Sequence, residues 1–334
     1  MFKIARGSAK AREELFTESA AKRGVRPIII EKDFWVCFVL KLLFEDSPYR
    51  TSLVFKGGTS LSKSYGLIER FSEDIDLVLD SKLLGFPEDH LAQTFESKTR
   101  QDKFNKEINR LAGEFITQKV VPELNALFGS LETGLTASTH ESDPQVVNIR
   151  YPASFSEEYI RPEVRLEIGP LASWVPSEER VIRPYASETF PEVFETPSCR
   201  VLTITAERTF WEKATILHQE AHRDGLIPQR HSRHYYDLER LARSTVKERA
   251  LADLNLLKDV VEFKSRFYPS AWARYDLAVP GSLRLLPSGE EKMAGLERDY
   301  EAMQLMLFGE APTFQAIVDR LTALETEINE LKPE

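Results

Sequence analysis

The chain has 334 residues, of which 42% are hydrophobic and 29% charged, the composition of a folded globular protein. This length exceeds what one ordinary domain core holds, so we expect two domains or one domain with a large elaboration. Lys and Arg number 44 and Asp and Glu 53, giving a formal net charge of −9. That balance excludes a protein that coats nucleic acid by bulk charge, although a local basic groove is still allowed.

Cysteine content and hydropathy narrow the class further. Two cysteines, Cys37 and Cys199, are too few for a disulfide framework or a cysteine-rich zinc site. The best candidate for a membrane span, the mostly apolar stretch 34–44, is shorter than the roughly 18 residues that a span requires. The N-terminus lacks the apolar run of a signal peptide. We therefore expect a cytoplasmic protein with no membrane partner.

Hydrophobic periodicity predicts an α+β chain with an N-terminal α/β part, residues 1–200, and a helical part, residues 201–334. In the first part it predicts helices at 9–21, 27–44, 59–65 and 86–127, and strands at 52–55, 74–79, 146–151 and 164–168. Five prolines between 170 and 197 indicate a linker or an irregular insertion. After a short apolar segment at 201–202, helices are expected at 206–222, 235–243, 247–267, 290–307 and 313–331.

One stretch combines features of a phosphate site. The strand at 52–55 runs into Gly57-Gly58, whose missing Cβ atoms let backbone N–H groups approach a ligand closely. Thr59 and Ser60 then begin a helix, so amides, hydroxyls and the helix dipole favour one phosphate-binding spot. A glycine pair alone is most often only a turn, so this interpretation depends on its context.

The next strand supplies that context. Asp74 and Asp76 share one face of it because strand residues two apart point the same way. Two close carboxylates repel each other unless a cation lies between them, and oxygen ligands favour Mg²⁺. A phosphate cradle beside metal-binding carboxylates is the apparatus of phosphoryl or nucleotidyl transfer. An Asp-x-Asp pattern alone would more often be a solvated strand face.

These motifs resemble a known family. Lys-Gly-Gly-Thr-Ser-Leu at 56–61 and Arg-Phe-Ser-Glu-Asp-Ile-Asp-Leu at 70–77 are similar to the signature of the AbiEii/AbiGii toxins, nucleotidyltransferases of the DNA polymerase β-like superfamily. Segments 31–35, 207–213 and 233–238 resemble further motifs of that family. The resemblance implies a polymerase β-like core with a mixed sheet and helices, followed by a C-terminal helical domain. Residues 60–73 make a longer gap than is usual, which leaves open whether Thr59 or Ser60 contacts phosphate.

The resemblance also implies a set of site residues. Expected catalytic residues are Asp74, Asp76, Glu167, Lys213 and Asp237, with Asp74, Asp76 and Glu167 as metal ligands. Expected nucleotide-binding residues are Lys56, Gly57, Gly58, Thr59, Ser60, Lys63, Ser72 and Lys213.

Three of these assignments have open alternatives. Glu163 is the reserve for the third carboxylate, and Glu167 could instead form a same-face ion pair with Arg165. Lys213 could be an ordinary solvated helix lysine. Asp237 could compensate a helix dipole near an N-terminus.

Four histidines cluster late in the chain, at His218, His222, His231 and His234. His218 and His222 are four residues apart, but the glutamate between them is one place off the zinc-protease pattern. We expect these histidines to join Arg223, Arg230 and Arg233 in a basic strip that faces phosphate, rather than to bind zinc.

The leading functional hypothesis is a Mg²⁺-dependent nucleotidyltransferase that moves NMP from an NTP to an acceptor hydroxyl and releases pyrophosphate. The resemblance implies a toxin of a type IV-like toxin–antitoxin or abortive phage infection system, with an antitoxin partner and an RNA acceptor such as a tRNA 3′ end. Basic residues between 98 and 119 could hold RNA locally. The alternatives are a small-molecule (antibiotic) nucleotidyltransferase and a non-catalytic nucleotide-binding module.

Overall fold

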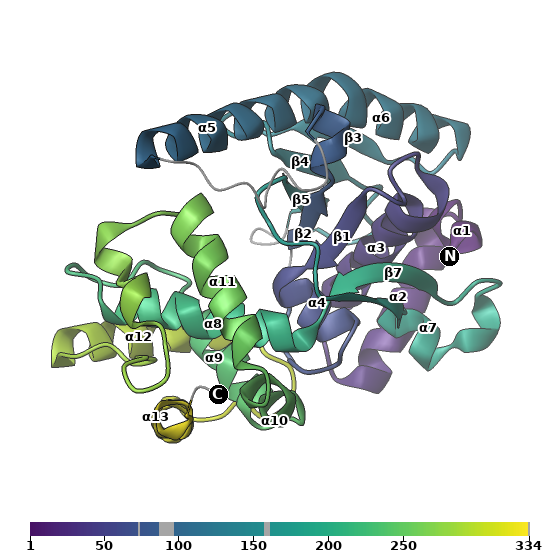
Figure 1. The fold of residues 1–334 in the computed structure, drawn as a ribbon. Helices are drawn as coiled ribbons and strands as arrows, with labels where there is room; N and C mark the ends of the chain where they lie inside the picture. The colour runs from purple at the N-terminus through teal and green to yellow at the C-terminus, as the bar shows by residue number, and fades with distance from the viewer. Residues whose placement is uncertain (73, 87–96, 157–160, 333–334) are drawn as a thin grey trace. The chain divides into compact units, whose positions relative to one another are not determined.

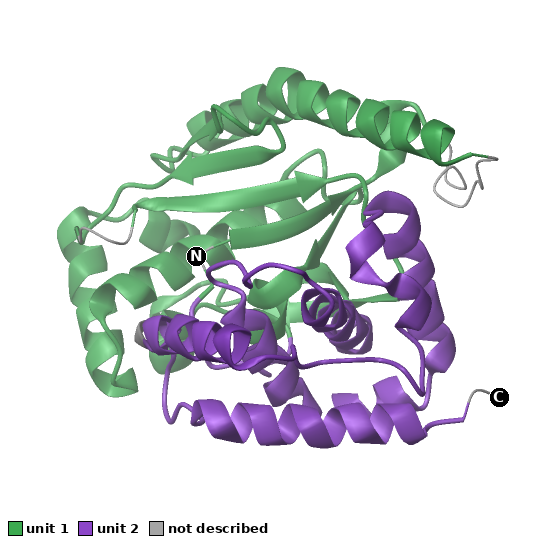
Figure 2. Cartoon of the chain, turned by 90° about the vertical axis from the view of Figure 1, so that its left-hand side faces the viewer, with its two compact units in different colours: residues 1–64, 72–204 green, residues 65–71, 205–334 purple. Residues whose placement is uncertain are grey.

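The computed structural model describes residues 1–72, 74–86, 97–156 and 161–332. The chain forms two compact units, shown in green and purple in Figure 2. Unit 1 contains residues 1–64 and 72–204, and unit 2 contains residues 65–71 and 205–334. The segment 65–71 thus packs with the C-terminal helices although its neighbours in sequence lie in unit 1.

Unit 1 is built on a seven-stranded sheet with the strand order β3-β4-β5-β2-β1-β7-β6 (Figure 1). β1 runs antiparallel to β2 and parallel to β7, and β2 runs parallel to β5, so the sheet is mixed. The expected α+β class with a mixed sheet is confirmed. The strands are β1 (Leu53–Lys56), β2 (Asp74–Leu79), β3 (Thr136–Thr139), β4 (Val146–Arg150), β5 (Glu163–Gly169), β6 (Ser177–Ile182) and β7 (Cys199–Ile204).

The helices of unit 1 pack mainly on one face of this sheet. α3 begins with Pro27 in its first turn, where the missing N–H costs nothing, and is buried along nearly its whole length. Phe34 and Phe38 of α3 belong to the same core cluster as Phe55 and Ile75 of the sheet. The helices are α1 (Phe2–Ala5), α2 (Ala9–Arg23), α3 (Pro27–Lys41), α4 (Gly57–Lys63), α5 (Lys98–Phe115), α6 (Val121–Ser130) and α7 (Tyr185–Thr189), and π-helical turns at Leu42–Asp46 and Ile116–Val120 continue α3 and α5.

Charged residues at the start of α3 are buried because they bind loops of unit 1. The two carboxylate oxygens of Glu31 accept the backbone N–H groups of Ser154, at 2.6 Å, and Phe155, at 3.2 Å. Lys32 donates to the carbonyl of Arg161 at 3.2 Å. The charged residues at 31–33 therefore join α3 to loops of unit 1, and each buried charge has a partner.

The two strands that carry the candidate carboxylates alternate as predicted. In β2, Ile75 and Leu77 are fully buried in the core, while Asp74 and Asp76 are half-buried on the other face. In β5, Leu166 is buried and Glu167 is half-buried in the same way. The helix-covered face thus holds the core, and the opposite face carries the polar residues of the candidate site.

The proline-rich segment 170–197 is not the linker or irregular insertion expected from the sequence. It contains β6, which pairs antiparallel with β7 along six residues, and α7. β6 is an edge strand with one neighbour, so it tolerates Pro176 at its start and the exposed Glu178 and Glu179. β7 is longer than the expected segment at 201–202, and β3 was not expected. Residues 87–96 of the helix expected at 86–127 lie outside the described residues.

Unit 2 is helical, and its helices begin and end close to the expected positions. The structure has two helices where one was expected at 247–267. The second of them begins at Leu254, because Asp253 caps it by accepting the backbone N–H of Leu256 at 3.1 Å. Among the described residues, no helix is both long and apolar enough to cross a membrane. The helices are α8 (Ala206–Ala221), α9 (Ser232–Ala242), α10 (Val246–Leu251), α11 (Leu254–Phe267), α12 (Glu290–Met303) and α13 (Phe314–Glu330).

Candidate active site

The turn after β1 is shaped around the carboxylate of Asp76. Gly57 has a φ of +80°, a backbone conformation that L side chains rarely adopt. A Cβ atom at this position would lie 1.8 Å from Oδ2 of Asp76 and 2.7 Å from its Cγ. Glycine is therefore required both by the backbone and by space, and the Asp76 carboxylate lies directly against the glycine turn.

A row of charged residues crosses the sheet at this point. Asp76 of β2 is in register with Lys56 of β1 on one side and with Glu167 of β5 on the other. Residues in register on neighbouring strands share a face, so these three side chains are neighbours. Asp74 lies on the same face in the adjacent row, opposite Arg165. The sheet thus brings together Lys56, Asp74, Asp76 and Glu167, and the sequence predicted strands for the three carboxylates.

The hydroxyls of Thr59 and Ser60 are committed to the backbone. Thr59 Oγ1 donates to the carbonyl of Asp74, and Ser60 Oγ donates to the carbonyl of Gly57 at 2.8 Å. Both side chains are buried. In this structure they hold α4 against the start of β2 and fix the glycine turn. The N-cap residue of α4, Lys56, makes no side-chain capping bond.

Lys63, expected among the nucleotide-binding residues, is placed elsewhere. Its Nζ forms an ion pair with Asp33 Oδ1 at 2.6 Å and lies 3.8 Å from the ring centroid of Tyr185. Burial alone would lower the pKa of Lys63, but the Asp33 carboxylate reverses this and raises the pKa above its usual value. Lys63 therefore ties α4 to α3. Ser72 is half-buried at the start of unit 1's second segment, and its neighbour Glu73 lies outside the described residues.

Glu167, the expected third carboxylate, forms the ion pair with Arg165 that was the alternative to a catalytic role. Glu167 Oε1 lies 3.3 Å from Arg165 Nε, and both side chains are more than 40% exposed. Glu163, the alternative third carboxylate, has its Oε1 atom 3.9 Å from Nη1 of Arg161. Within the described ranges, no three His, Cys, Asp or Glu side chains are grouped closely enough to hold a metal ion. Asp74, Asp76 and Glu167 therefore share a face without forming a ready-made three-carboxylate site.

A divalent cation nevertheless fits the donors present. Mg²⁺ in nucleotide enzymes is commonly bound by one or two carboxylates together with substrate phosphates, rather than by a complete protein cage. Asp74 and Asp76 supply two such carboxylates on one face. The absence of a Cβ on Gly57 makes room for the Asp76 carboxylate beside the turn. The metal expected at these two residues is consistent with the structure if phosphate oxygens complete its shell.

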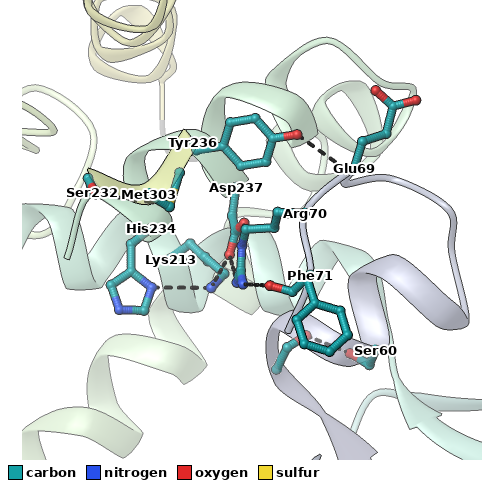
Figure 3. Close-up of polar contacts among 11 residues, drawn as sticks. Ser60, Glu69, Arg70, Phe71, Lys213, Ser232, His234, Tyr236, Asp237 and Met303 are labelled. Carbon is teal, nitrogen blue, oxygen red and sulfur yellow. Dashed lines mark hydrogen bonds and ion pairs between the residues drawn. The ribbon is translucent and has the colours of Figure 1, made fainter. Parts of the chain in front are cut away.

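Lys213 lies in α8 and is almost completely buried, so the interpretation of a solvated helix lysine is wrong. Its Nζ is 2.7 Å from Asp237 Oδ2 and 3.2 Å from His234 Nδ1 (Figure 3). Burial lowers the pKa of Lys213, and the Arg70 guanidinium lowers it further, against the opposing effect of Asp237. This lysine is held in one position by a buried carboxylate.

Asp237 is fully buried and accepts bonds from two cations. Arg70 donates through Nε to Oδ1 at 2.7 Å and through Nη2 to Oδ2 at 2.9 Å, a two-pronged pair, and Lys213 adds the third bond (Figure 3). Burial alone would raise the pKa of Asp237, but Arg70 and Lys213 outweigh it and hold the pKa well below its usual range. Asp237 lies past the first turn of α9, so the helix-dipole interpretation is wrong.

Arg70 was not expected as a site residue from the sequence. It lies 167 residues before Asp237, so no local spacing connects the two. The only available signal was its place in the motif at 70–77, four residues before Asp74.

Two members of the expected phosphate-facing strip, His218 and Arg223, are bonded to structural partners. His218 is buried, its Nδ1 accepts the backbone N–H of Arg284 at 3.0 Å, and its Nε2 donates to the carbonyl of Arg274 at 2.9 Å. Burial lowers the pKa of His218 to about 4, so the ring is neutral and joins two backbone segments. Arg223 pairs with Glu220 at 2.6 Å. These side chains have structural partners within unit 2.

A mixed sheet that sets two carboxylates beside a glycine turn, in a chain with a helical second unit, suits a nucleotidyltransferase. The family model for the AbiEii nucleotidyl transferase toxins of type IV toxin–antitoxin systems matches residues 41–320. The chain belongs to this family, as its motifs predicted, and it is a nucleotidyltransferase.

Two solved structures are similar to the chain. MenT4, a nucleotidyltransferase toxin from Mycobacterium tuberculosis H37Rv, aligns with a TM-score of 0.52 and 18% identity over 96% of this chain and 90% of that one, which shows a shared fold. JHP933 from Helicobacter pylori aligns with a TM-score of 0.33 and 19% identity over 89% of this chain and 94% of that one. No curated protein matches the chain.

Proposed function

We propose that this toxin transfers NMP from an NTP to an acceptor hydroxyl, with Asp74 and Asp76 as the ligands of a Mg²⁺ ion. The observation that carries the proposal is the packing of the Asp76 carboxylate against Gly57, with Asp74 on the same face. This arrangement supports phosphate and metal binding at one spot. Bound there, Mg²⁺ would neutralise negative charge on the triphosphate oxygens.

The glycine turn binds the triphosphate through its backbone. Gly57 and Gly58 have no side chains that keep phosphate oxygens away from the main chain. The side-chain hydroxyls of Thr59 and Ser60 stabilise the turn by donating hydrogen bonds to backbone carbonyls. Lys56, in register with Asp76, adds a positive charge beside the carboxylates. During transfer, the acceptor oxygen forms a bond to the α-phosphorus, the bond from that phosphorus to the bridging oxygen breaks, and pyrophosphate leaves.

Glu167 is the proposed acceptor of the hydroxyl proton. It neighbours Asp76 in the sheet, so it lies beside the metal carboxylates. Its ion pair with Arg165 is solvent-exposed, and such pairs contribute only about 0–1 kcal/mol. Release of Glu167 from Arg165 therefore costs little when the substrates are bound.

Lys213 is the proposed cation for the triphosphate, and Asp237 holds its ammonium group in place. The 2.7 Å bond to Asp237 fixes the Nζ, and burial removes competing water. Positioned charges in such surroundings stabilise developing charge more strongly than they would in water. Asp237 supports Lys213 rather than contacting the nucleotide itself.

The proposed acceptor is RNA, such as a tRNA 3′ end, and the proposed setting is a cytoplasmic toxin–antitoxin system that limits phage infection. The positive charge that α5 presents is smaller than its number of Lys and Arg residues suggested. Lys106 pairs with Asp102 at 2.8 Å, and Arg110 pairs with Glu107 at 2.6 Å, so part of the charge is neutralised within the helix. Lys98 and Lys103 are exposed near its N-terminal end.

The acceptor can be identified with α-labelled nucleotides. Purified protein is incubated with Mg²⁺ and each labelled NTP in turn, together with total RNA or with an aminoglycoside. We expect label on RNA from one preferred NTP. Label on the aminoglycoside alone would support the small-molecule alternative, and no label on either would support the non-catalytic module.

A further inference from the structure

The segment just before β2 is bonded into unit 2 through its main chain. The backbone N–H of Phe71 donates to the carbonyl of Met306 at 2.7 Å, and that of Phe308 donates to the carbonyl of Glu69 at 2.7 Å. The backbone N–H of Glu69 donates to the hydroxyl of Tyr236 in α9 at 3.2 Å (Figure 3). These bonds place residues 69–71 in a fixed position on the helical unit.

Arg70 is the middle residue of this segment, and both its backbone and its side chain are bonded to unit 2. Its backbone forms an antiparallel bridge with Leu307, and its guanidinium forms the two-pronged pair with Asp237. Arg70 is 5% exposed and Asp237 0% exposed, so the pair is shielded from water. A planar guanidinium matches both carboxylate oxygens at once, which the single ammonium of a lysine does not.

One carboxylate therefore joins Arg70 to the proposed triphosphate cation. Asp237 Oδ2 accepts from Arg70 and also from Lys213, the proposed triphosphate cation. The position of the Lys213 amine is therefore set by the buried pair of Arg70 and Asp237.

We infer that Arg70 is a positioning residue for nucleotidyl transfer, which acts through Asp237 to hold the amine of Lys213. This inference rests on the proposed function of Lys213. Arg70 contacts protein groups in all the bonds described above, and its contribution is geometric. The Asp237 carboxylate accepts three bonds from two cationic side chains, Arg70 and Lys213, which gives it a supporting role. The depressed pKa of Asp237 agrees with this, because so weak a base is a poor proton acceptor.

The test is a double-mutant cycle between Arg70→Lys and Lys213→Ala, with NMP transfer as the readout. Arg70→Lys keeps the charge and removes the two-pronged geometry. Arg208→Lys is the matched control, because Arg208 is also buried in unit 2 and pairs with a different carboxylate, Glu212, at 3.3 Å. Circular dichroism and thermal unfolding verify that each variant folds.

We expect Arg70→Lys to lower kcat by at least tenfold and up to about 10²-fold, as small displacements of catalytic groups do, while Arg208→Lys stays within about twofold. In the Lys213→Ala background, Arg70→Lys should add little further loss, because its effect passes through Lys213. Near wild-type transfer by Arg70→Lys would overturn the inference. An equal fold-loss in both backgrounds would also overturn it, since that pattern indicates general damage to the fold.

Two further results keep the inference separable from the proposed function. If wild-type protein transfers NMP but Lys213→Ala is equally active, the proposed role of Lys213 fails, and the inference fails with it. If Lys213→Ala is impaired and Arg70→Lys is not, only the inference fails. Should Arg70→Lys not fold, Asp237→Glu replaces it in the same cycle, because it keeps the buried charge and moves the carboxylate by one methylene. The same outcomes then apply.

Discussion

The carboxylate of Asp76 lies where the side chain of residue 57 would have to begin. A Cβ atom on Gly57 would be 1.8 Å from Asp76 Oδ2, far inside any allowed contact. The two positions are thus coupled across the β1–β2 pair, and one of the two proposed metal ligands is held against the turn that is proposed to bind phosphate.

Gly57→Ala should abolish transfer, because the new Cβ must displace the Asp76 carboxylate. Gly24→Ala is the matched control, since Gly24 has a similar φ of +67° but a Cβ atom there would have no neighbour within 4 Å. Gly24→Ala should lose roughly 1–2 kcal/mol of unfolding free energy from the left-handed backbone, and Gly57→Ala should lose at least as much, both measured by urea unfolding. Only Gly57→Ala should lose activity, by on the order of 10²-fold or more. Equal activity of the two variants would show that the fit between residue 57 and Asp76 is unimportant.

Lys213 should give transfer an alkaline limit. The pKa of Lys213 is lowered by burial and by Arg70, so its ammonium form is lost at a lower pH than that of an ordinary lysine, about 10.4. Because the ammonium is the proposed active form, kcat should fall as pH rises through the lowered pKa. Lys213→Arg should show lower activity but no such fall, since arginine stays protonated. A pH–rate profile checks this, and an identical alkaline limb in both proteins would assign the limit to another group.

Asp237→Asn should destabilise the fold. It leaves the buried Arg70 and Lys213 without their counter-charge, which typically costs about 3–5 kcal/mol. The control is Asp319→Asn, at an exposed position that accepts a bond from Gln315, with an expected change within about 0.5 kcal/mol.

The pH dependence of this loss has a definite sign. The folded-state pKa of Asp237 is depressed, so its stabilising contribution is present above the unfolded value of about 3.9 and is lost as pH falls through the folded pKa. The difference in unfolding free energy between wild type and Asp237→Asn should be full at pH 7 and should shrink in strong acid. A difference independent of pH would indicate that the charge of Asp237 is not the cause.

The strand residues of the candidate site were predictable because they follow a local rule. Alternation in β2 places Asp74 and Asp76 on one face from sequence alone, and the structure confirms it. The same rule failed for β6, where an edge position permits exposed charges that break the alternation.

Partners that lie far apart in sequence could not be predicted in this way. Arg70 and Asp237 are 167 residues apart, and their pairing depends on tertiary packing that no spacing encodes. Lys63 looked like a phosphate ligand from its place beside the glycine motif, yet Asp33 of α3 binds it. The sequence around a lysine does not tell whether it binds phosphate or pairs with a buried carboxylate. For Lys63, the position of Asp33 decides this, and that position depends on the fold.

RNA binding should depend on one end of α5 more than the other. Lys98→Gln with Lys103→Gln should weaken RNA binding and reduce its salt dependence by a slope of roughly 0.7–0.9 for each phosphate that is no longer neutralised. Lys106→Gln with Arg110→Gln is the comparison, since these side chains pair with acidic neighbours in the helix and should have a smaller effect. Filter binding across a salt series checks this. Equal effects, or none, would mean that α5 is only a solvated face.

The most direct test measures incorporation of α-labelled NMP by wild-type protein and by Asp74→Asn and Asp76→Asn in the presence of Mg²⁺. Removing one of two repelling carboxylates should cost little stability, so both variants should fold as the wild type does. We expect the wild type to transfer label from at least one NTP, and each variant to lose this activity by on the order of 10²–10³-fold. Transfer by either folded variant at the wild-type rate would contradict the assignment of Asp74 and Asp76 as the metal-binding carboxylates of the enzyme.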